Sequence, residues 1–330
     1  MLRSLRKCIS NGRLRQVGRF LLTVGVFVFV GSAITFAQDS RRGQVFRDCP
    51  DCPEMVMVPP GSFQMGFEGG LEGRFEGPVR KVEISRAFAL GRTEITNAQW
   101  RRFVAETGHP TGEKCAIWNV NRWTLVEGVS WTNPNDGRPI RENEPVVCVS
   151  WHDARAYVAW LSQLTGAPYR LPAEAEWEYA ARAGKVGEFT WGNKAEDGCR
   201  VANIYDVSAQ DPNRPFPVTS CNDRFTSIAP VASFEKNGFE LYDMTGNVWE
   251  WMEDCYVMPA PSQPVDGKPQ ITNGCDRRVT KGGAWSSPIF WQRPTFRGRD
   301  DPNLMSHIFG FRIARDLSPD GAGSRRTTSH

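Results

Sequence analysis

The chain has 330 residues, with 40 Lys and Arg against 37 Asp and Glu, a formal charge of +3. Six of the basic residues and none of the acidic ones fall within residues 1–37, which leaves 34 basic and 37 acidic residues in the remainder. A mildly acidic body disfavours nucleic-acid binding, because that affinity depends on neutralising phosphates. The 40% hydrophobic content and the 12 Trp exclude wholesale disorder.

The N-terminus has the pattern of an export signal. Basic residues up to Arg19 precede an apolar run from Phe20 to Ile34. The segment Thr35-Phe36-Ala37 then places small residues at the two positions that a signal peptidase recognises, so cleavage is expected near Ala37. The apolar run is shorter than the ~20 residues that a membrane helix needs. We therefore expect residues 1–37 to be a cleaved signal peptide rather than a retained anchor, and the mature protein to be periplasmic or secreted, with no stable membrane span.

Cysteine content agrees with export. Cys8 lies in the signal, and the eight cysteines that remain are an even number, which is typical of disulfides in exported proteins. Order alone leaves about 105 pairings open. We predict that neighbours along the chain pair, as Cys49–Cys52, Cys115–Cys148, Cys199–Cys221 and Cys255–Cys275. Zinc is disfavoured, because no second CxxC or His pair follows the first CxxC.

The predicted elements begin after a polar segment, residues 38–47, which we expect to be flexible. The apolar run Met55–Val58 ends at a Pro-Pro-Gly turn and predicts a strand, and a second strand region covers residues 82–88. Residues 109–145 lack a clear period and are predicted to be a long loop. Short strands and loops are expected over 185–315.

Capping residues predict three helices. The first is expected to start at Thr96 and stop at Gly108, the second to start at Ser150 and stop at Gly166, and the third to start at Pro172 and stop at Gly184. Acidic side chains at the start of a helix favour its dipole. We therefore expect Glu174, Glu176 and Glu178 to be structural helix-cap and surface charges. The polar C-terminal residues 317–330 are predicted to be a disordered tail.

Six motifs in a fixed order resemble the formylglycine-generating enzyme (sulfatase-modifying factor) family. They are Met55 to Gly66, Glu94-Ile95-Thr96-Asn97, Tyr169 to Glu178, Gly246-Asn247-Val248-Trp249-Glu250-Trp251, Lys281 to Trp285 and Gly310-Phe311-Arg312. The resemblance implies an α+β, loop-rich single domain over residues 48–316, with a fold related to C-type lectins.

The resemblance also implies structural calcium. One family site falls on Asp243, Gly246, Val248 and Glu250, where two carboxylates and two carbonyls from a tight turn would supply the hard oxygen ligands that calcium prefers. An ordinary turn with solvent-facing carboxylates is the alternative. A second family site falls on Asn203, Ile204, Asp223 and Phe225, with side chains from the first and third residues and carbonyls from the others.

The resemblance breaks at the copper site. Formylglycine-generating enzymes oxidise a substrate cysteine with a copper ion that two cysteines hold. Here the first of these positions is Ser287, and the second falls in a segment without a thiol, because Cys275 is the last cysteine. A hydroxyl is too hard and too weakly acidic to replace a thiolate on Cu(I), so copper is not expected. The four His residues show no metal-ligand spacing in the sequence either: His109, His152, His307 and His330.

The resemblance implies a cleft that aromatic, Ser and Arg side chains line. Its expected residues are Trp249, Ser286, Ser287, Trp291, Arg293 and Arg297. Trp249, Ser287 and Arg297 are the catalytic candidates, and aromatic faces with Arg suit a peptide or a planar aromatic substrate. The family includes a periplasmic member that completes the oxidation of the pyoverdine chromophore without the cysteine pair, and this chain resembles it in export and in the missing thiols.

Three functions compete. The chain is predicted to be an exported maturation factor of oxidoreductase type that acts on a peptide, a protein or a small peptide-derived substrate. The alternative is a non-catalytic, lectin-like binding module, since such scaffolds host many functions. A true formylglycine-generating oxidase is disfavoured by the missing thiols.

Overall fold

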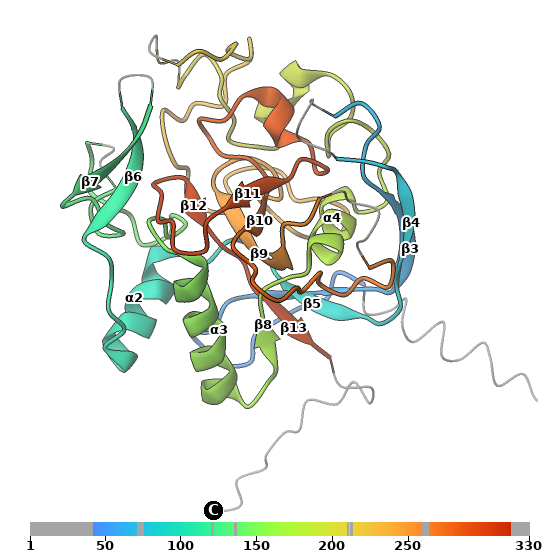
Figure 1. Cartoon of the computed structure of the whole chain (residues 1–330), viewed down its shortest axis with the longest axis horizontal. Helices are drawn as coiled ribbons and strands as arrows, with labels where there is room; N and C mark the ends of the chain where they lie inside the picture. The colour runs from blue at the N-terminus through green and yellow to red at the C-terminus, as the bar shows by residue number, and fades with distance from the viewer. Residues whose placement is uncertain are drawn as a thin grey trace, which may run out of the picture.

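The computed structural model describes residues 42–70, 76–119, 122–134, 137–209, 211, 214–258 and 264–317. The predicted signal peptide lies outside these ranges, as does the predicted tail apart from Leu317. Within the described ranges, no helix is long and apolar enough to cross a membrane. The architecture is α+β and rich in loops, as the sequence predicts (Figure 1).

A five-stranded antiparallel sheet joins the two ends of the described chain. Its strand order is β1 (Val45–Phe46), β2 (Met55–Val58), β5 (Phe88–Gly91), β13 (Ala314–Asp316) and β8 (Tyr169–Arg170). Strand β1 falls within the segment that we expected to be flexible. It is ordered because it pairs with β2, with Val45 opposite Val56, so regular structure begins before residue 48.

A second sheet has four strands, in the order β11 (Gly298–Asp300), β10 (Arg278–Lys281), β9 (Trp249–Cys255) and β12 (Phe309–Gly310). Strand β12 runs parallel to β9 and the other pairs are antiparallel. The pairing brings two signature motifs together, because Phe309 lies opposite Trp249 and Gly310 opposite Glu250.

Two hairpins complete the strands. Strands β3 (Gly61–Met65) and β4 (Arg80–Ile84) form one, and β6 (Lys114–Asn119) and β7 (Arg122–Glu127) form the other. The second hairpin corrects our expectation of a long loop over 109–145. It extends along one side of the molecule, at the left of Figure 1.

The three predicted helices are present as α2 (Asn97–Thr107), α3 (Trp151–Thr165) and α4 (Glu174–Arg182). Capping boxes begin α2 and α3, and Gly108 and Gly166 end them in the left-handed region. Helix α4 begins at Glu174 rather than at Pro172, and Ala183 takes the left-handed position at its end, with φ 45°. The 3₁₀ helices η1 (Ala195–Arg200) and η3 (Ile289–Gln292) follow in the described chain.

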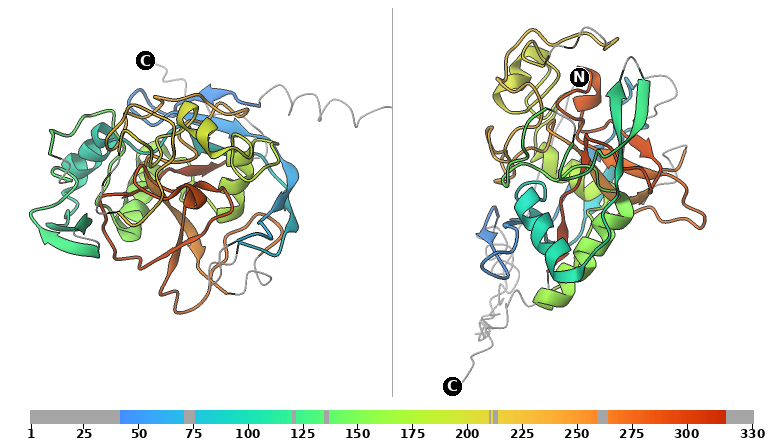
Figure 2. Two further views of the ribbon diagram at one scale, coloured as in Figure 1. Left: turned by 90° about the horizontal axis from the view of Figure 1, so that it is seen from above. Right: turned by 90° about the vertical axis from the view of Figure 1, so that its left-hand side faces the viewer.

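An aromatic core packs α2 and α3 onto the C-terminal segment. The Tyr157 ring on α3 lies 5.4 Å from that of Phe311, and the Trp100 ring on α2 lies 6.1 Å from the same ring. Figure 2 shows these two helices beside each other in both views. All four predicted disulfides are present, so the prediction that neighbouring cysteines pair is confirmed.

Candidate functional site

A cavity of about 270 Å³ lies between the β6–β7 hairpin and the four-stranded sheet. Its lining is mostly aromatic and aliphatic: Ala116, Trp123, Trp249, Trp291, Phe296, Gly298, Asp300, Leu304, Ser306, Ile308 and Phe309. The Trp291 ring stacks on Phe296 at 5.6 Å, and the Trp249 ring lies 5.9 Å from Phe296. Apolar clefts of this size with few polar groups are the usual form of a small-molecule or side-chain site.

Two of the predicted cleft residues, Trp249 and Trp291, line this cavity. Sequence reasoning missed the contribution of the hairpin, which supplies Ala116 and Trp123. Pairing of Trp118 with Trp123 across the hairpin is a recognisable cross-strand aromatic signal, but the charged residues around it obscured the strand pattern.

Ser287 lies directly behind the cavity wall. The Trp249 indole N–H donates to Ser287 Oγ at 3.2 Å, and the Ala284 backbone N–H donates to the same oxygen at 3.2 Å. Both Ser287 and Trp249 are buried. Among the described residues, no imidazole or carboxylate is hydrogen-bonded to Ser287, so the serine fixes the orientation of the indole and lacks the base that a nucleophile needs.

Arg297 does not line the cavity. Its neighbours Phe296 and Gly298 do, but Arg297 is not among the lining residues. Instead, Arg297 Nε donates to Glu174 Oε1 at 2.8 Å, and its guanidinium lies 4.7 Å from the centre of the Tyr256 ring. The structure therefore gives this catalytic candidate a place in an ion-pair network behind the wall.

That network corrects our expectation for the three α4 glutamates. Glu174, Glu176 and Glu178 are 1%, 7% and 1% exposed, and so are not surface charges. The fully buried Lys281 Nζ lies 3.5 Å from Glu174 and 3.7 Å from Glu178. Glu174 and Glu178 can be buried because Lys281 and Arg297, more than a hundred residues later, supply opposite charge, whereas Glu176 pairs with Arg170 at 2.7 Å.

In the first predicted calcium set, one carboxylate is already paired with an arginine. Glu250 accepts from Arg312 Nε at 2.6 Å and from Arg312 Nη2 at 2.7 Å, and it also accepts from the Trp177 indole at 2.7 Å. Asp243 accepts from the Ala232 N–H at 2.7 Å, and burial raises the pKa of its carboxyl. Because both Glu250 oxygens pair with the Arg312 guanidinium, this set fits a calcium ion less well than the second.

The second predicted calcium set has one uncommitted side-chain oxygen and no charged donor. Asn203 is fully buried, and its Oδ1 accepts no hydrogen bond from the described residues. Asp223 accepts from the Ile204 N–H at 2.9 Å and from the Phe225 N–H at 2.8 Å. Burial raises the pKa of Asp223 to about 6, since none of these donors carries a charge. Buried, oxygen-rich loops of this kind fit calcium.

A buried histidine adjoins the hairpin. The His307 ring lies 5.8 Å from that of Trp123 and 6.1 Å from that of Trp285. Its Nε2 has no partner among the described residues, and burial lowers the pKa of the imidazole to about 4. The ring is therefore neutral at physiological pH and acts as a packing group.

The low pKa of His307 predicts acid sensitivity. In an unfolded chain His titrates near pH 6.5, so the folded protein binds fewer protons between pH 6.5 and 4 and loses stability as the pH falls through that range. We expect the wild type to lose about 3 kcal/mol more than His307→Phe between pH 7 and pH 4. Urea unfolding at the two pH values measures the difference, and equal losses in both proteins would contradict it.

Another cavity, of about 310 Å³, lies at the edge of the five-stranded sheet near residues 84–88 and 266–269. Most of its charged lining residues are paired, since Arg170 pairs with Glu176 at 2.7 Å and with Asp316 at 2.8 Å, and Lys268 pairs with Asp266 at 2.6 Å. None of the predicted site residues lines it. We therefore take the aromatic cavity as the candidate site.

Comparison with known proteins settles the family. The model of the sulfatase-modifying factor enzyme 1-like domain matches residues 41–317. The chain belongs to this family. The formylglycine-generating enzyme of Mus musculus is 33% identical over 297 residues, which cover 81% of this chain and 76% of the relative. The inactive C-alpha-formylglycine-generating enzyme 2 of Bos taurus is 34% identical, over 79% of this chain and 87% of the relative.

Solved structures agree. That of PvdO from Pseudomonas aeruginosa superposes with a TM-score of 0.69 at 33% identity, and the match covers 84% of this chain and 99% of that one. The family and its loop-rich α+β fold, both predicted from the motifs, are thus confirmed. A function like that of a modifying factor follows from membership.

Proposed function

We propose that the chain is an exported maturation factor of oxidoreductase type, which acts on a peptide or a peptide-derived compound in the aromatic cavity without a copper–dicysteine site. The contact between Trp249 and Ser287 carries this proposal. Trp249 forms an aromatic wall of the cavity and contacts Ser287, the position at which the family resemblance places the first copper cysteine. A hydroxyl therefore occupies this position instead of a thiolate. The cysteines from Cys49 to Cys275 all form disulfides, so the described chain offers Cu(I) no thiol.

The four disulfides also support export, because such bonds persist in oxidising compartments. A cavity of about 270 Å³ accommodates one planar or apolar group of a larger substrate. In an oxidation, two electrons and two protons leave that group, and dioxygen accepts them to become hydrogen peroxide. The protein binds the group in the cavity that Trp249 and Trp291 line and excludes water from it.

The test measures dioxygen uptake and peroxide formation by the purified mature chain with cysteine peptides and peptide-derived siderophore precursors. We expect Trp291→Ala to lower kcat/KM by about 10- to 100-fold, because it removes one aromatic face from the cavity. Trp160→Ala is the matched control, since Trp160 packs on Phe103 of α2 and does not line the cavity. Equal activity in the two variants would contradict a role for the cavity.

A non-catalytic binding module is the second candidate. One observation favours it: Ser287 Oγ accepts two hydrogen bonds and has no bonded base among the described residues. Tight binding of a peptide or glycan, without dioxygen uptake for any substrate, would establish the module and overturn the enzyme proposal.

We also propose that Asn203, Ile204, Asp223 and Phe225 hold a structural calcium ion. The ion would neutralise the buried Asp223 and join the loops that carry the four residues. The set of Asp243, Gly246, Val248 and Glu250 stays a prediction.

Calcium removal is expected to lower the thermal stability. A ligand that binds only the folded state at a hundred times its Kd contributes about 2.7 kcal/mol. For a chain of this size we expect EGTA to lower Tm by about 5 °C or more. Calcium should restore Tm when magnesium does not. Identical melting curves with and without chelator would contradict the calcium proposal.

A further inference from the structure

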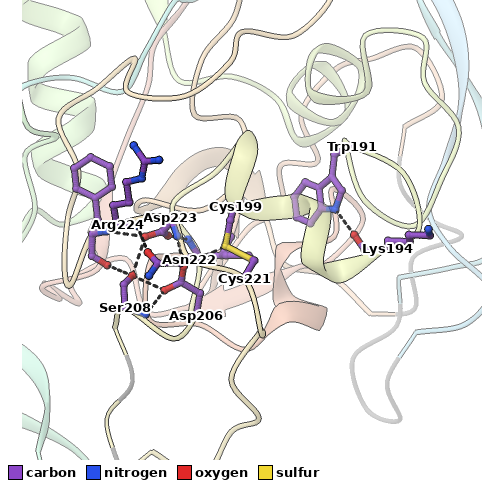
Figure 3. The surroundings of a disulfide bond; sticks show 11 residues. Trp191, Lys194, Cys199, Asp206, Ser208, Cys221, Asn222, Asp223 and Arg224 are labelled. Atoms are coloured by element: carbon purple, nitrogen blue, oxygen red, sulfur yellow. Dashed lines mark hydrogen bonds between the residues drawn. A yellow bond between two sulfur atoms is a disulfide. The ribbon is translucent and has the colours of Figure 1, made fainter.

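Ser208 Oγ lies among three acceptor oxygens beside the Cys199–Cys221 disulfide (Figure 3). Ser208 Oγ lies 2.5 Å from Asp206 Oδ1, 3.0 Å from Asp223 Oδ1 and 2.8 Å from the Phe225 carbonyl oxygen. A hydroxyl has one proton and can donate to only one of these three acceptors. The other two contacts bring oxygens together without a proton between them, which is the arrangement that a bound cation stabilises.

The charge at this point also lacks a balance. Asp206 is 0% exposed and Asp223 is 5% exposed. The described partners of Asp206 are the N–H groups of Ser208 and Asp223 and the Ser208 hydroxyl, all of them neutral. Cys199 Sγ lies 3.1 Å from Asp206 Oδ2, but a disulfide sulfur has no proton to donate. Buried carboxylates are normally paired with a cation, so two of them in contact with the same hydroxyl indicate a missing positive charge.

A separate observation points to a ligand. The side-chain oxygen of Asn203 is buried and accepts no hydrogen bond from any described residue. The next residue in the chain, Ile204, donates its N–H to Asp223. The sulfurs of Cys199 and Cys221 lie within 4.8 Å of an Asp206 oxygen, but their disulfide removes them as ligands. The atoms left to bind a cation are therefore all oxygen, which selects a hard ion such as calcium.

We propose that Asp206 and Ser208 are additional ligands of the calcium ion at Asp223, so that the site has two carboxylates where the four predicted positions supply one. This inference rests on the calcium part of the proposed function. Ligand charge is a main determinant of calcium affinity, so the second carboxylate makes this a tighter site than the four positions alone would. The Cys199–Cys221 disulfide holds η1 against the loop that carries Asp223 and so keeps the oxygens together.

The test titrates calcium into the full mature chain after chelator treatment, by calorimetry. We expect Asp206→Asn to raise Kd at least about tenfold, since it removes a charge but keeps an oxygen. Asp223→Asn should abolish binding. Asp197→Asn is the matched control, because Asp197 is an exposed acid on η1 that does not contact the oxygens, and its Kd should equal that of the wild type.

Terbium luminescence lifetimes in H₂O and D₂O give an independent measurement that a merely structural role would not move. Ser208→Ala should add about one water to the bound ion, because water replaces the lost hydroxyl. Wild-type affinity in Asp206→Asn together with an unchanged water count in Ser208→Ala would overturn this inference and leave calcium at Asp223. Absence of calcium binding by the wild type itself would overturn both this inference and the calcium proposal.

Discussion

Arg312→Met is expected to destabilise the fold by about 3–5 kcal/mol, because it leaves buried carboxylates without their cation. Arg312 is fully buried. It pairs with Glu250 through two nitrogens and donates to the carbonyls of Gly91, Tyr242 and Asp243 at 3.0–3.1 Å. A typical domain is stable by only about 5–15 kcal/mol, so the loss removes a large part of the total.

The surroundings of Arg312 make this cost hard to avoid. Burial raises the pKa of Glu94, and that of Asp243 as well, which shows that their charges are already poorly tolerated. Replacing Arg312 removes the buried guanidinium that pairs with Glu250, so the remaining carboxylate charges become still less stable in the interior. Arg312→Lys should lose less than Arg312→Met, but it cannot reproduce the paired hydrogen bonds of the planar fork.

Urea unfolding of the wild type and of Arg312→Met measures the loss of unfolding free energy. The matched control is Arg299→Met, which removes an exposed arginine from β11 and should leave the unfolding midpoint unchanged. An Arg312→Met protein with the wild-type midpoint would contradict the assignment of Arg312 as the central cation of this network.

Loss of the Cys115–Cys148 disulfide is expected to have the second large effect. The bond links residues 33 apart in the sequence, and loop-closure entropy assigns about 4 kcal/mol to a loop of that size. It also anchors β6, whose Ala116 lines the cavity. Cys115→Ala/Cys148→Ala should therefore lower the stability and weaken ligand binding in the cavity together.

The Cys49–Cys52 bond provides a control of the same chemistry. It spans only 3 residues of sequence, and the same entropy estimate gives about 1.5 kcal/mol. Removing it should also leave ligand affinity unchanged, since neither cysteine lines the cavity. If both double variants lose the same stability and the same affinity, the hairpin anchor has no special role.

Local signals carried most of the fold prediction. The capping box of Thr96 with Gln99 and the N-cap residue Ser150 placed two helix starts, because a cap depends only on residues close in the sequence. The β6–β7 hairpin was missed because its strands mix charged and aromatic residues. Its order depends on remote contacts, such as the hydrogen bond from the Ala116 N–H to the Met305 carbonyl at 2.8 Å.

The sequence predicted those site residues that lie in or next to recognised motifs, and these motifs are adjacent in the fold. Trp249 and Ser287 lie together because β9 and the Gly-Gly turn after β10 are adjacent in the sheet. Arg297 is absent from the cavity lining although Phe296 and Gly298 belong to it, and a two-residue alternation cannot show which residues face the cavity without the fold. Asp206 offered one weak signal, an acid and a serine in Asp206-Val207-Ser208, shortly after Asn203.

The central claim is that the chain keeps its family's fold and cleft but lacks the thiolates that hold copper. The most direct measurement incubates the purified chain with Cu(I), dioxygen and a sulfatase-type cysteine peptide, and follows the peptide by mass spectrometry. We predict that the cysteine stays unconverted and that no stoichiometric Cu(I) binds near Ser287. Conversion of the cysteine to formylglycine, stopped by a Cu(I) chelator, would contradict the account.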